Sequence, residues 1–92
     1  MRLELSERFQ RDVRGLDAAG RAAVLDALLA LPTALGAVHR HVGLGLRKLH
    51  ARGIWEARVG LGLRLVFALD ADTCTLVRVG SHEDVRRFLK SL

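Results

Sequence analysis

The chain has 92 residues, with one cysteine, one proline and few aromatic side chains. Because Cys74 is alone, no intrachain disulfide can form, and we interpret it as a small core residue rather than a nucleophile. No uninterrupted apolar run reaches the ~18 residues of a membrane span, and the first residues lack the apolar segment of a signal peptide. We therefore expect a cytoplasmic protein with no membrane segment.

Motifs for metal and nucleotide chemistry are also lacking. No His-x-x-x-His lies on a predicted helix, and His39-x-His41 alone is a weak metal site. The two Gly-Leu-Gly segments do not have the spacing of phosphate-binding loops. No carboxylate pair suits a two-metal nuclease. We expect no metal and no cofactor.

The charge of the chain is basic and unevenly distributed. Lys and Arg number 15 against 10 Asp and Glu, and the pI is about 11.0. The whole excess of +5 lies in residues 40–64, where Glu56 is the only acidic residue. Such a segment is either an ordinary solvated surface or the binding surface for a polyanion. Its confinement to one segment favours a nucleic acid.

Sequence patterns predict a single α+β domain over residues 1–92, with the order β-α-α-β-β-β-α. A strand at 2–5 precedes two helices, one capped by Ser6 and one capped by Asp17 and ended by Pro32. The second helix should bury a stripe consisting of Val24, Leu25, Leu28, Leu29 and Leu31. The two helices form an antiparallel hairpin, and residues 33–50 are a glycine-containing basic connection.

The second half of the chain predicts an antiparallel meander, covered by the helical hairpin and followed by a C-terminal helix. Alternating apolar residues place strands at 55–59, 63–69 and 73–79. Ser81 and Asp84 form the capping box of the last helix.

The predicted register gathers arginines on one face of this meander. A three-residue loop at 60–62 places Arg58 opposite Arg64, and a loop at 70–72 places Arg64 opposite Arg78. A four-residue second loop would break the row. Like charges side by side on a sheet are unfavourable, so the row indicates an anion-binding surface. Glu56 is the candidate ionic partner of Arg58.

A histidine completes the candidate site. His82 lies in the first turn of the last helix, where backbone N–H groups attract anions. Beside fixed cations it suits general acid–base catalysis, with Arg64 and Arg78 binding the phosphate. The alternatives are a plain surface histidine and strand arginines paired with acids. Phe88 either stacks on a base or, as its place in the helix stripe favours, packs in the core.

The segment from Leu49 to Phe88 resembles the RelE/ParE superfamily of type II toxin–antitoxin toxins. The resemblance lies in Leu-His-Ala-Arg-Gly-Ile-Trp-Glu-Ala-Arg-Val, in Arg-Leu-Val-Phe from Arg64, and in Arg-Val-Gly-Ser-His from Arg78. It implies a catalytic, phosphate-binding Arg64. The YafQ-like branch of the family implies active-site roles for Arg78 and His82. The resemblance also implies cleavage of mRNA, typically on the ribosome, and neutralisation by a cognate antitoxin.

The chain departs from the family pattern in its proton-transfer residues. RelE has lysines where Trp55 and Ala57 stand and a tyrosine near Phe88, whereas this chain has no tyrosine. The Asp-Trp pair of the YafQ-like branch falls at 62–63, as Gly-Leu. His82 must therefore carry more of the proton transfer, with His50 or His41 as helpers.

The leading hypothesis is a ribosome-dependent mRNA endonuclease that needs no metal. Because no metal site is expected, the nucleophile would have to be the 2′-hydroxyl of the RNA itself. The residues expected to bind the RNA backbone through salt-sensitive contacts are Arg47, Lys48, His50, Arg52 and Arg58. One alternative is a ParE-like toxin that inhibits DNA gyrase without cutting RNA. Another is a catalytically weak module that binds RNA or its antitoxin.

Overall fold

The computed structural model describes residues 1–36, 45–60 and 62–92. Its elements are β1 (Arg2–Leu5), α1 (Glu7–Arg14), α2 (Ala18–Gly36), β2 (Arg47–His50), β3 (Ile54–Val59), β4 (Leu63–Asp70), β5 (Thr73–Gly80) and α3 (His82–Lys90). The strands form one sheet in the order β1-β5-β4-β3-β2, in which β1 runs parallel to β5 and the other neighbours are antiparallel. The predicted α+β class and meander are confirmed.

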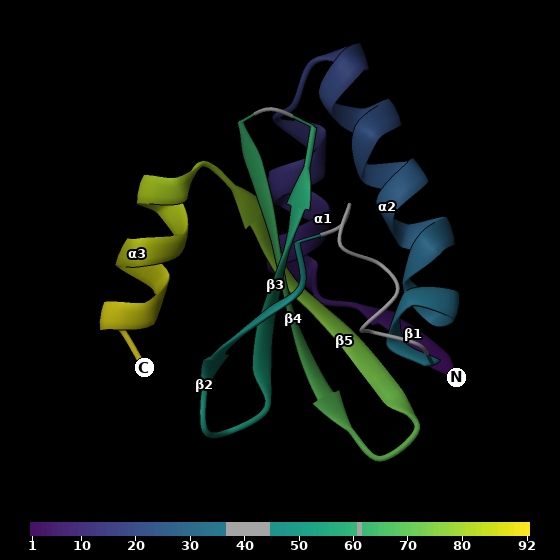
Figure 1. Cartoon of the computed structure of the whole chain (residues 1–92). Helices are drawn as coiled ribbons and strands as arrows, with labels where there is room; N and C mark the ends of the chain where they lie inside the picture. Colours follow the sequence, from purple (N-terminus) through teal and green to yellow (C-terminus); the bar gives the residue numbers. More distant parts are fainter. Residues whose placement is uncertain (37–44, 61) are drawn as a thin grey trace.

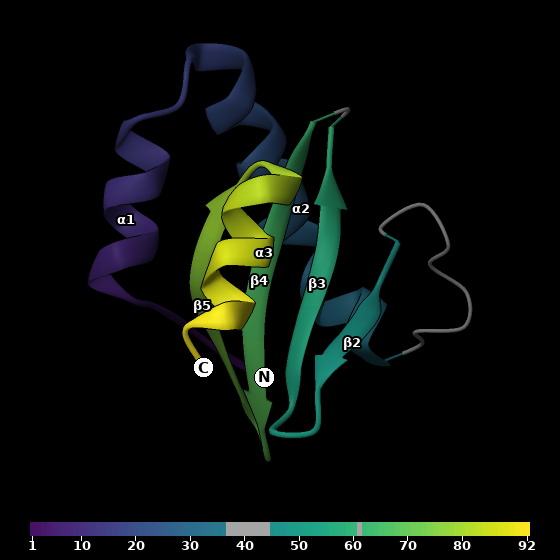
Figure 2. The same ribbon diagram turned by 90° about the vertical axis from the view of Figure 1, so that its left-hand side faces the viewer.

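The sheet lies between two helical layers. Figure 1 shows α1 and α2 on one face and α3 on the other. On the first face, α1 packs on β5 and α2 packs on β3. On the second, α3 packs mainly on β4 and β5, and β3 and β2 extend beyond it (Figure 2). This face is therefore partly uncovered at the edge that carries β2.

The main core lies between the helical hairpin and the sheet. Alternation places Ala57, Val59, Leu65 and Phe67 on this side, all 2% exposed or less, as the sequence predicts. The other side has a second, smaller buried region, because Val66 on β4 and Val85 on α3 are also buried. The middle strand is thus covered on both faces.

The predicted helix starts are confirmed. The Ser6 hydroxyl accepts a hydrogen bond from the Phe9 N–H at 3.0 Å, and Asp17 Oδ1 accepts one from the Gly20 N–H at 2.7 Å. Ser81 forms the expected capping box with Asp84. These side chains satisfy backbone N–H groups that have no partner inside the helix.

Two expectations for α2 are wrong. The helix does not end at Pro32 but continues to Gly36, because proline already has a helical φ and its missing N–H removes one hydrogen bond near the helix end. The predicted stripe is also wrong at two positions, since Leu25 is 56% exposed and Leu29 is 72% exposed, whereas Val24 and Leu31 are buried and Leu28 packs against the core. Small side chains occupy much of the buried face, which consists of Val24, Ala27, Leu31 and Ala34.

The apolar character of α2 also bears on the membrane expectation. An 18-residue window, Ala18–Leu35, has a mean hydropathy of 1.4 and is long and apolar enough to cross a membrane by length and composition alone. However, it contains Arg21 and Asp26, and one face of the helix packs on the sheet. Its apolar residues therefore contribute to this fold.

One strand was not predicted. Residues 47–50, which we assigned to a connection, form β2 and pair with β3. The order is therefore β-α-α-β-β-β-β-α. The pattern Arg-Lys-Leu-His is too short and too polar to predict a strand, and its pairing depends on the edge that β3 presents. This added strand forms one border of the site described next.

Candidate functional site

A hollow of about 330 Å³ lies at the partly uncovered edge of the sheet. Its lining comes from β2, β3, β4, the start of α3 and the residues before β2, namely Gly45, Leu46, Arg47, Glu56, Arg58, Arg64 and His82. Three arginines and one histidine face a single carboxylate in this set. We call it the cationic hollow.

The pairing of β3 with β4 sets the centre of the cationic hollow. Arg58 lies directly opposite Arg64, as predicted. Among the described residues, no carboxylate lies within salt-bridge distance of either guanidinium. Two adjacent like charges without a counterion are unfavourable in a sheet, so a bound anion would relieve this repulsion.

Gly45 allows the chain to approach Arg58 closely. Its φ is +56°, and a Cβ at this position would lie 2.3 Å from Arg58 Nε. Only glycine combines this left-handed backbone with such a short approach. The backbone at Gly45 thus packs against the arginine and limits its freedom on one side of the hollow.

The junction of β5 and α3 places His82. Gly80 ends the strand, and a Cβ there would lie 2.6 Å from Asp84 Oδ2. The backbone N–H of Ser81 donates to Asp84 Oδ2 at 2.9 Å, and the Ser81 hydroxyl donates to the same oxygen at 3.0 Å. These bonds from Ser81, the backbone bond most of all, lower the pKa of Asp84. The capping box fixes the start of α3, and His82 is the first helical residue.

Glu56 has a different partner from the one expected. The residue is only 5% exposed, and its carboxylate lies 3.2 Å from the Arg47 guanidinium on β2. Arg47 is its register partner across the β2–β3 pair. Because β2 was not predicted, sequence reasoning could not find this ion pair and assigned Glu56 to Arg58 instead.

The predicted row of three arginines is wrong at Arg78. The β4–β5 turn is tighter than expected, with Asp70 pairing with Thr73, and the register then shifts between Val66 and Phe67. Arg64 lies opposite Gly80, and Arg78 lies opposite Val66. The physical reason is this shorter turn together with a bulge at Val77 of β5, which has no register partner on β4. There the Ser6 hydroxyl donates to the Val77 carbonyl at 3.2 Å.

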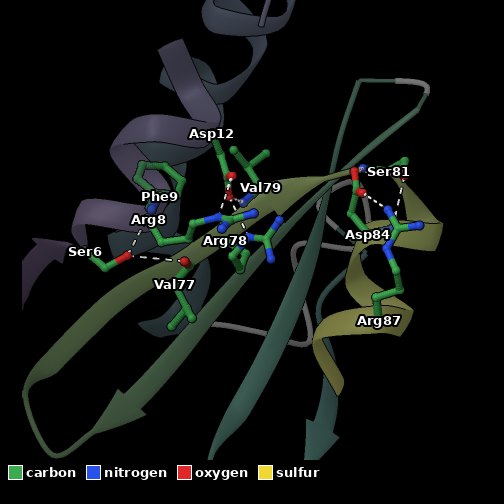
Figure 3. Close-up of polar contacts among 10 residues, drawn as sticks. All are labelled: Ser6, Arg8, Phe9, Asp12, Val77, Arg78, Val79, Ser81, Asp84 and Arg87. Carbon is green, nitrogen blue, oxygen red and sulfur yellow. Dashed lines mark hydrogen bonds and ion pairs between the residues drawn. The ribbon is translucent and has the colours of Figure 1, made fainter. Parts of the chain in front are cut away.

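Arg78 instead belongs to a polar cluster with α1 (Figure 3). Asp12 Oδ2 accepts from Arg78 Nε at 2.8 Å and from the Val79 N–H at 3.1 Å, and Asp12 Oδ1 accepts from Arg8 Nε at 3.2 Å. This cluster lines a neighbouring hollow of about 480 Å³ that does not include Arg64 or His82. The structure thus brings together three of the four residues of the predicted site and separates Arg78.

The remaining candidate residues in the described part of the chain do not line the cationic hollow. Lys48 pairs with Trp55, which packs against the core, so Lys48 lies on the other face from Arg47. His50 and Arg52 are exposed in and after β2, and the Arg52 N–H donates to His50 Nδ1 at 3.2 Å. Phe88 is half-buried on α3 and is not part of the hollow lining.

The helper residue His41 and the weak metal pair at 39 and 41 lie outside the described residues. Within residues 1–36, 45–60 and 62–92, no group of three or more histidine, cysteine, aspartate or glutamate side chains is placed to hold a metal ion.

Sequence reasoning also missed Asp12 and Gly45. Asp12 follows an ordinary helical pattern, and nothing in the local sequence distinguishes it from Glu7, the exposed acid on the same helix. Gly45 belongs to a Gly-Leu-Gly segment, which was noted only for lacking phosphate-loop spacing. Its part in the site depends on a contact with Arg58, a residue far along the chain.

Several solved structures share this fold, and some of them are toxin–antitoxin complexes. YafQ from E. coli strain BL21(DE3) matches with a TM-score of 0.67 and 22% identity, covering 92% of this chain and 98% of that one. The toxin–antitoxin complex of RelB and RelE from Methanococcus jannaschii matches with 0.66 and 15%, covering 92% and 96%. The DinJ–YafQ complex from E. coli matches with 0.65 and 23%, covering 92% and 98%.

At these identities the structural matches establish the fold. No curated protein matches the chain by sequence. The model of one family, the ParE toxin of the type II toxin–antitoxin system parDE, matches residues 3–86. That match covers nearly the whole chain, so the protein belongs to the ParE toxin family and is a type II toxin of the RelE/ParE superfamily.

Proposed function

We propose that this toxin is an endoribonuclease that cleaves mRNA on the ribosome. The observation that carries the proposal is the convergence of Arg58, Arg64 and His82 on one hollow. Two fixed guanidinium groups can bind a phosphate, and a histidine beside them can transfer a proton near neutral pH. This combination suits attack by the 2′-hydroxyl on the adjacent phosphorus.

Each residue has a distinct part in this proposal. Arg64 binds the scissile phosphate and stabilises the charge that grows on its oxygens in the transition state. Arg58 holds the same phosphate or the next one, and His82 protonates the leaving oxygen or removes the proton of the nucleophile. Arg47 lines the hollow, and the exposed Arg52 and His50 extend the basic surface along the RNA.

Arg78 remains a predicted catalytic residue only if it can leave its present ion pair. Its Nε is bonded to Asp12, outside the cationic hollow. Contact with the same phosphate as Arg64 would require release from this carboxylate. We therefore expect Arg78 to act mainly by holding the end of β5, and thereby the start of α3, in place.

Inhibition of DNA gyrase is a second candidate, supported by the match to the ParE family model. Assays with purified toxin should distinguish the nuclease from the gyrase inhibitor. Ribosomes programmed with mRNA should yield fragments with 5′-hydroxyl and 2′,3′-cyclic phosphate ends, while supercoiled DNA with gyrase and ATP stays uncleaved. Gyrase-dependent DNA breaks with intact mRNA would contradict the nuclease proposal. If neither nucleic acid is cut, the chain is a binding module.

We also propose a cognate antitoxin as the partner of an apolar groove between α1 and α2. The groove has a volume of about 320 Å³, and its apolar lining consists of Leu5, Phe9, Val13, Val24, Leu25 and Leu28. Arg14 and Arg21 also line it. An amphipathic antitoxin segment with acidic flanks would match both features. The complexes of similar fold, DinJ–YafQ and RelB–RelE, support a partner of this class.

A further inference from the structure

Glu56 is the one acidic residue of the cationic hollow. It lies on β3 between Arg47 of β2 and Val66 of β4 in the sheet register. Burial of a carboxylate is costly unless it is paired, and Glu56 is 5% exposed with Arg47 as its ionic partner among the described residues. An ionised carboxylate has about four acceptor sites, so one guanidinium leaves room for a further donor.

The proton-transfer residues expected from sequence were few. Attack by a 2′-hydroxyl requires a group that accepts its proton and a second group that protonates the leaving oxygen. His82 can supply one of these functions. The structure places a carboxylate, Glu56, in the lining of the same hollow.

The sheet order separates these two groups. Glu56 lies on β3 beside the β2 edge, Arg64 lies on the next strand, and Arg64 pairs with Gly80 two residues before His82. Arg58 is two residues from Glu56 on the same face and lies opposite Arg64. The two arginines therefore stand between the carboxylate and the imidazole. A displacement at phosphorus with opposed entering and leaving oxygens needs this order.

We propose that Glu56 is the general base of the reaction and His82 is its general acid. This assignment rests on the proposed function. The 2′-oxygen forms a bond to phosphorus as its proton passes to the Glu56 carboxylate. The bond from phosphorus to the 5′-oxygen breaks, and that oxygen takes a proton from the His82 imidazolium. The products are a 2′,3′-cyclic phosphate and a 5′-hydroxyl, and exchange with water restores both side chains.

Arg47 has a defined part in this assignment. Its guanidinium lies 3.2 Å from Glu56 Oε1 and holds the carboxylate toward the β2 side of the hollow. The competing explanation is that Glu56 serves only to attach β2 to β3 through Arg47. Replacement by glutamine separates the two explanations, because an amide keeps the size and one acceptor oxygen but cannot take a proton.

The test is single-turnover cleavage on ribosomes programmed with an mRNA whose cut site has been mapped with the wild-type toxin. Glu56→Gln should slow cleavage by about 100-fold or more, while its thermal unfolding stays close to that of the wild type. Glu56→Asp, which keeps a carboxylate, should be faster than Glu56→Gln. The control is Glu83→Gln, since Glu83 is an exposed carboxylate beside His82 outside the hollow lining.

A modified substrate assigns the two proton transfers separately. Sulfur in place of the 5′-oxygen at the cut site leaves without protonation. It should therefore restore His82→Ala to within about tenfold of wild type and should not restore Glu56→Gln.

Three results would overturn the assignment. Natural RNA cut by Glu56→Gln within about threefold of wild type would make Glu56 an anchor only. Rescue of Glu56→Gln, rather than His82→Ala, by the sulfur substrate would reverse the roles. If the wild type cuts no RNA, the proposed function fails and the assignment fails with it.

Discussion

Asp12 joins two distant parts of the chain through a single side chain. Its carboxylate is 11% exposed and binds donors from Arg8, Arg78 and Val79, so α1 is held to the last part of β5. That part of β5 leads directly into the cap of α3. A residue without any contact to the cationic hollow can thus influence where His82 lies.

Asp12→Ala should lower the free energy of unfolding by about 2–3 kcal/mol, because it leaves a mostly buried Arg78 without its counterion. The measurement is urea denaturation of the single variants and of the double variant Asp12→Ala/Arg78→Ala. The double variant should be more stable than the sum of the single effects predicts. If the loss in the double variant equals the sum of the two single losses, the Asp12–Arg78 pair contributes no coupling energy and the prediction is wrong. Arg8→Ala, at an exposed arginine, should cost under about 0.5 kcal/mol.

The reactivity of the Cys74 thiol is a probe of how well the core is buried. It is fully buried on β5, and burial raises the pKa of its thiol to about 11. Because the thiolate is the reactive form, the native thiol should react with a disulfide reagent at pH 8 about 100-fold more slowly than in urea. The readout is absorbance of the released thiolate. Equal rates in the native and unfolded states would contradict this burial.

At the scale of the element, α3 depends on its first turn. The capping box of Ser81 and Asp84 lies between the strand end at Gly80 and His82. The ion pair between Asp84 and Arg87 on the surface adds little to stability. The cap is thus the main local device that fixes the direction of this helix.

Asp84→Ala should destabilise the protein by about 1 kcal/mol at pH 7 through loss of the cap. The folded pKa of Asp84 is lowered, so its contribution is present above the unfolded pKa and is lost as pH falls through the folded pKa. The difference between wild type and variant should therefore narrow in acid. Thermal denaturation of both proteins at pH 7 and near pH 3 measures this stability difference. A difference between wild type and variant that grows in acid would contradict the lowered pKa of Asp84.

The second element with a testable role is α2, whose exposed Leu25 is expected to contribute to antitoxin binding. Leu25→Asp should weaken antitoxin binding by about tenfold or more, since Leu25 lines the proposed antitoxin groove and, at more than half exposed, contributes little to the core. Isothermal titration with the antitoxin encoded beside the toxin measures this. Ala19→Asp is the control, an exposed site on the same helix. Unchanged affinity in Leu25→Asp would place the antitoxin elsewhere.

For the whole molecule, much of the fold follows from sequence because local patterns and burial agree. Alternation at Trp55, Ala57 and Val59 predicts one strand face, and the three-residue loop predicts Arg58 opposite Arg64. The helix starts at Ser6 and Ser81 were predicted because capping is local. The parDE family match agrees with the superfamily resemblance that the Arg64 and His82 motifs gave.

What could not be predicted depends on contacts between distant segments. The displacement of Arg78 follows from an irregularity in β5 where Ser6 and Asp12 bind, and no pattern within β5 indicates it. The ion pair of Glu56 needs β2, a strand that exists only because β3 presents an edge. The site is thus less predictable than the fold, because its members meet through these pairings.

The central claim is that the toxin acts through the cationic hollow. The most direct measurement is colony formation after induced expression of the toxin without antitoxin, with equal protein levels verified by immunoblot. Arg64→Ala and His82→Ala should abolish growth arrest, since each removes about 100-fold or more of activity, whereas Arg86→Ala, on the same helix outside the hollow lining, should arrest growth like the wild type. Growth arrest of wild-type strength by both hollow variants would contradict the account.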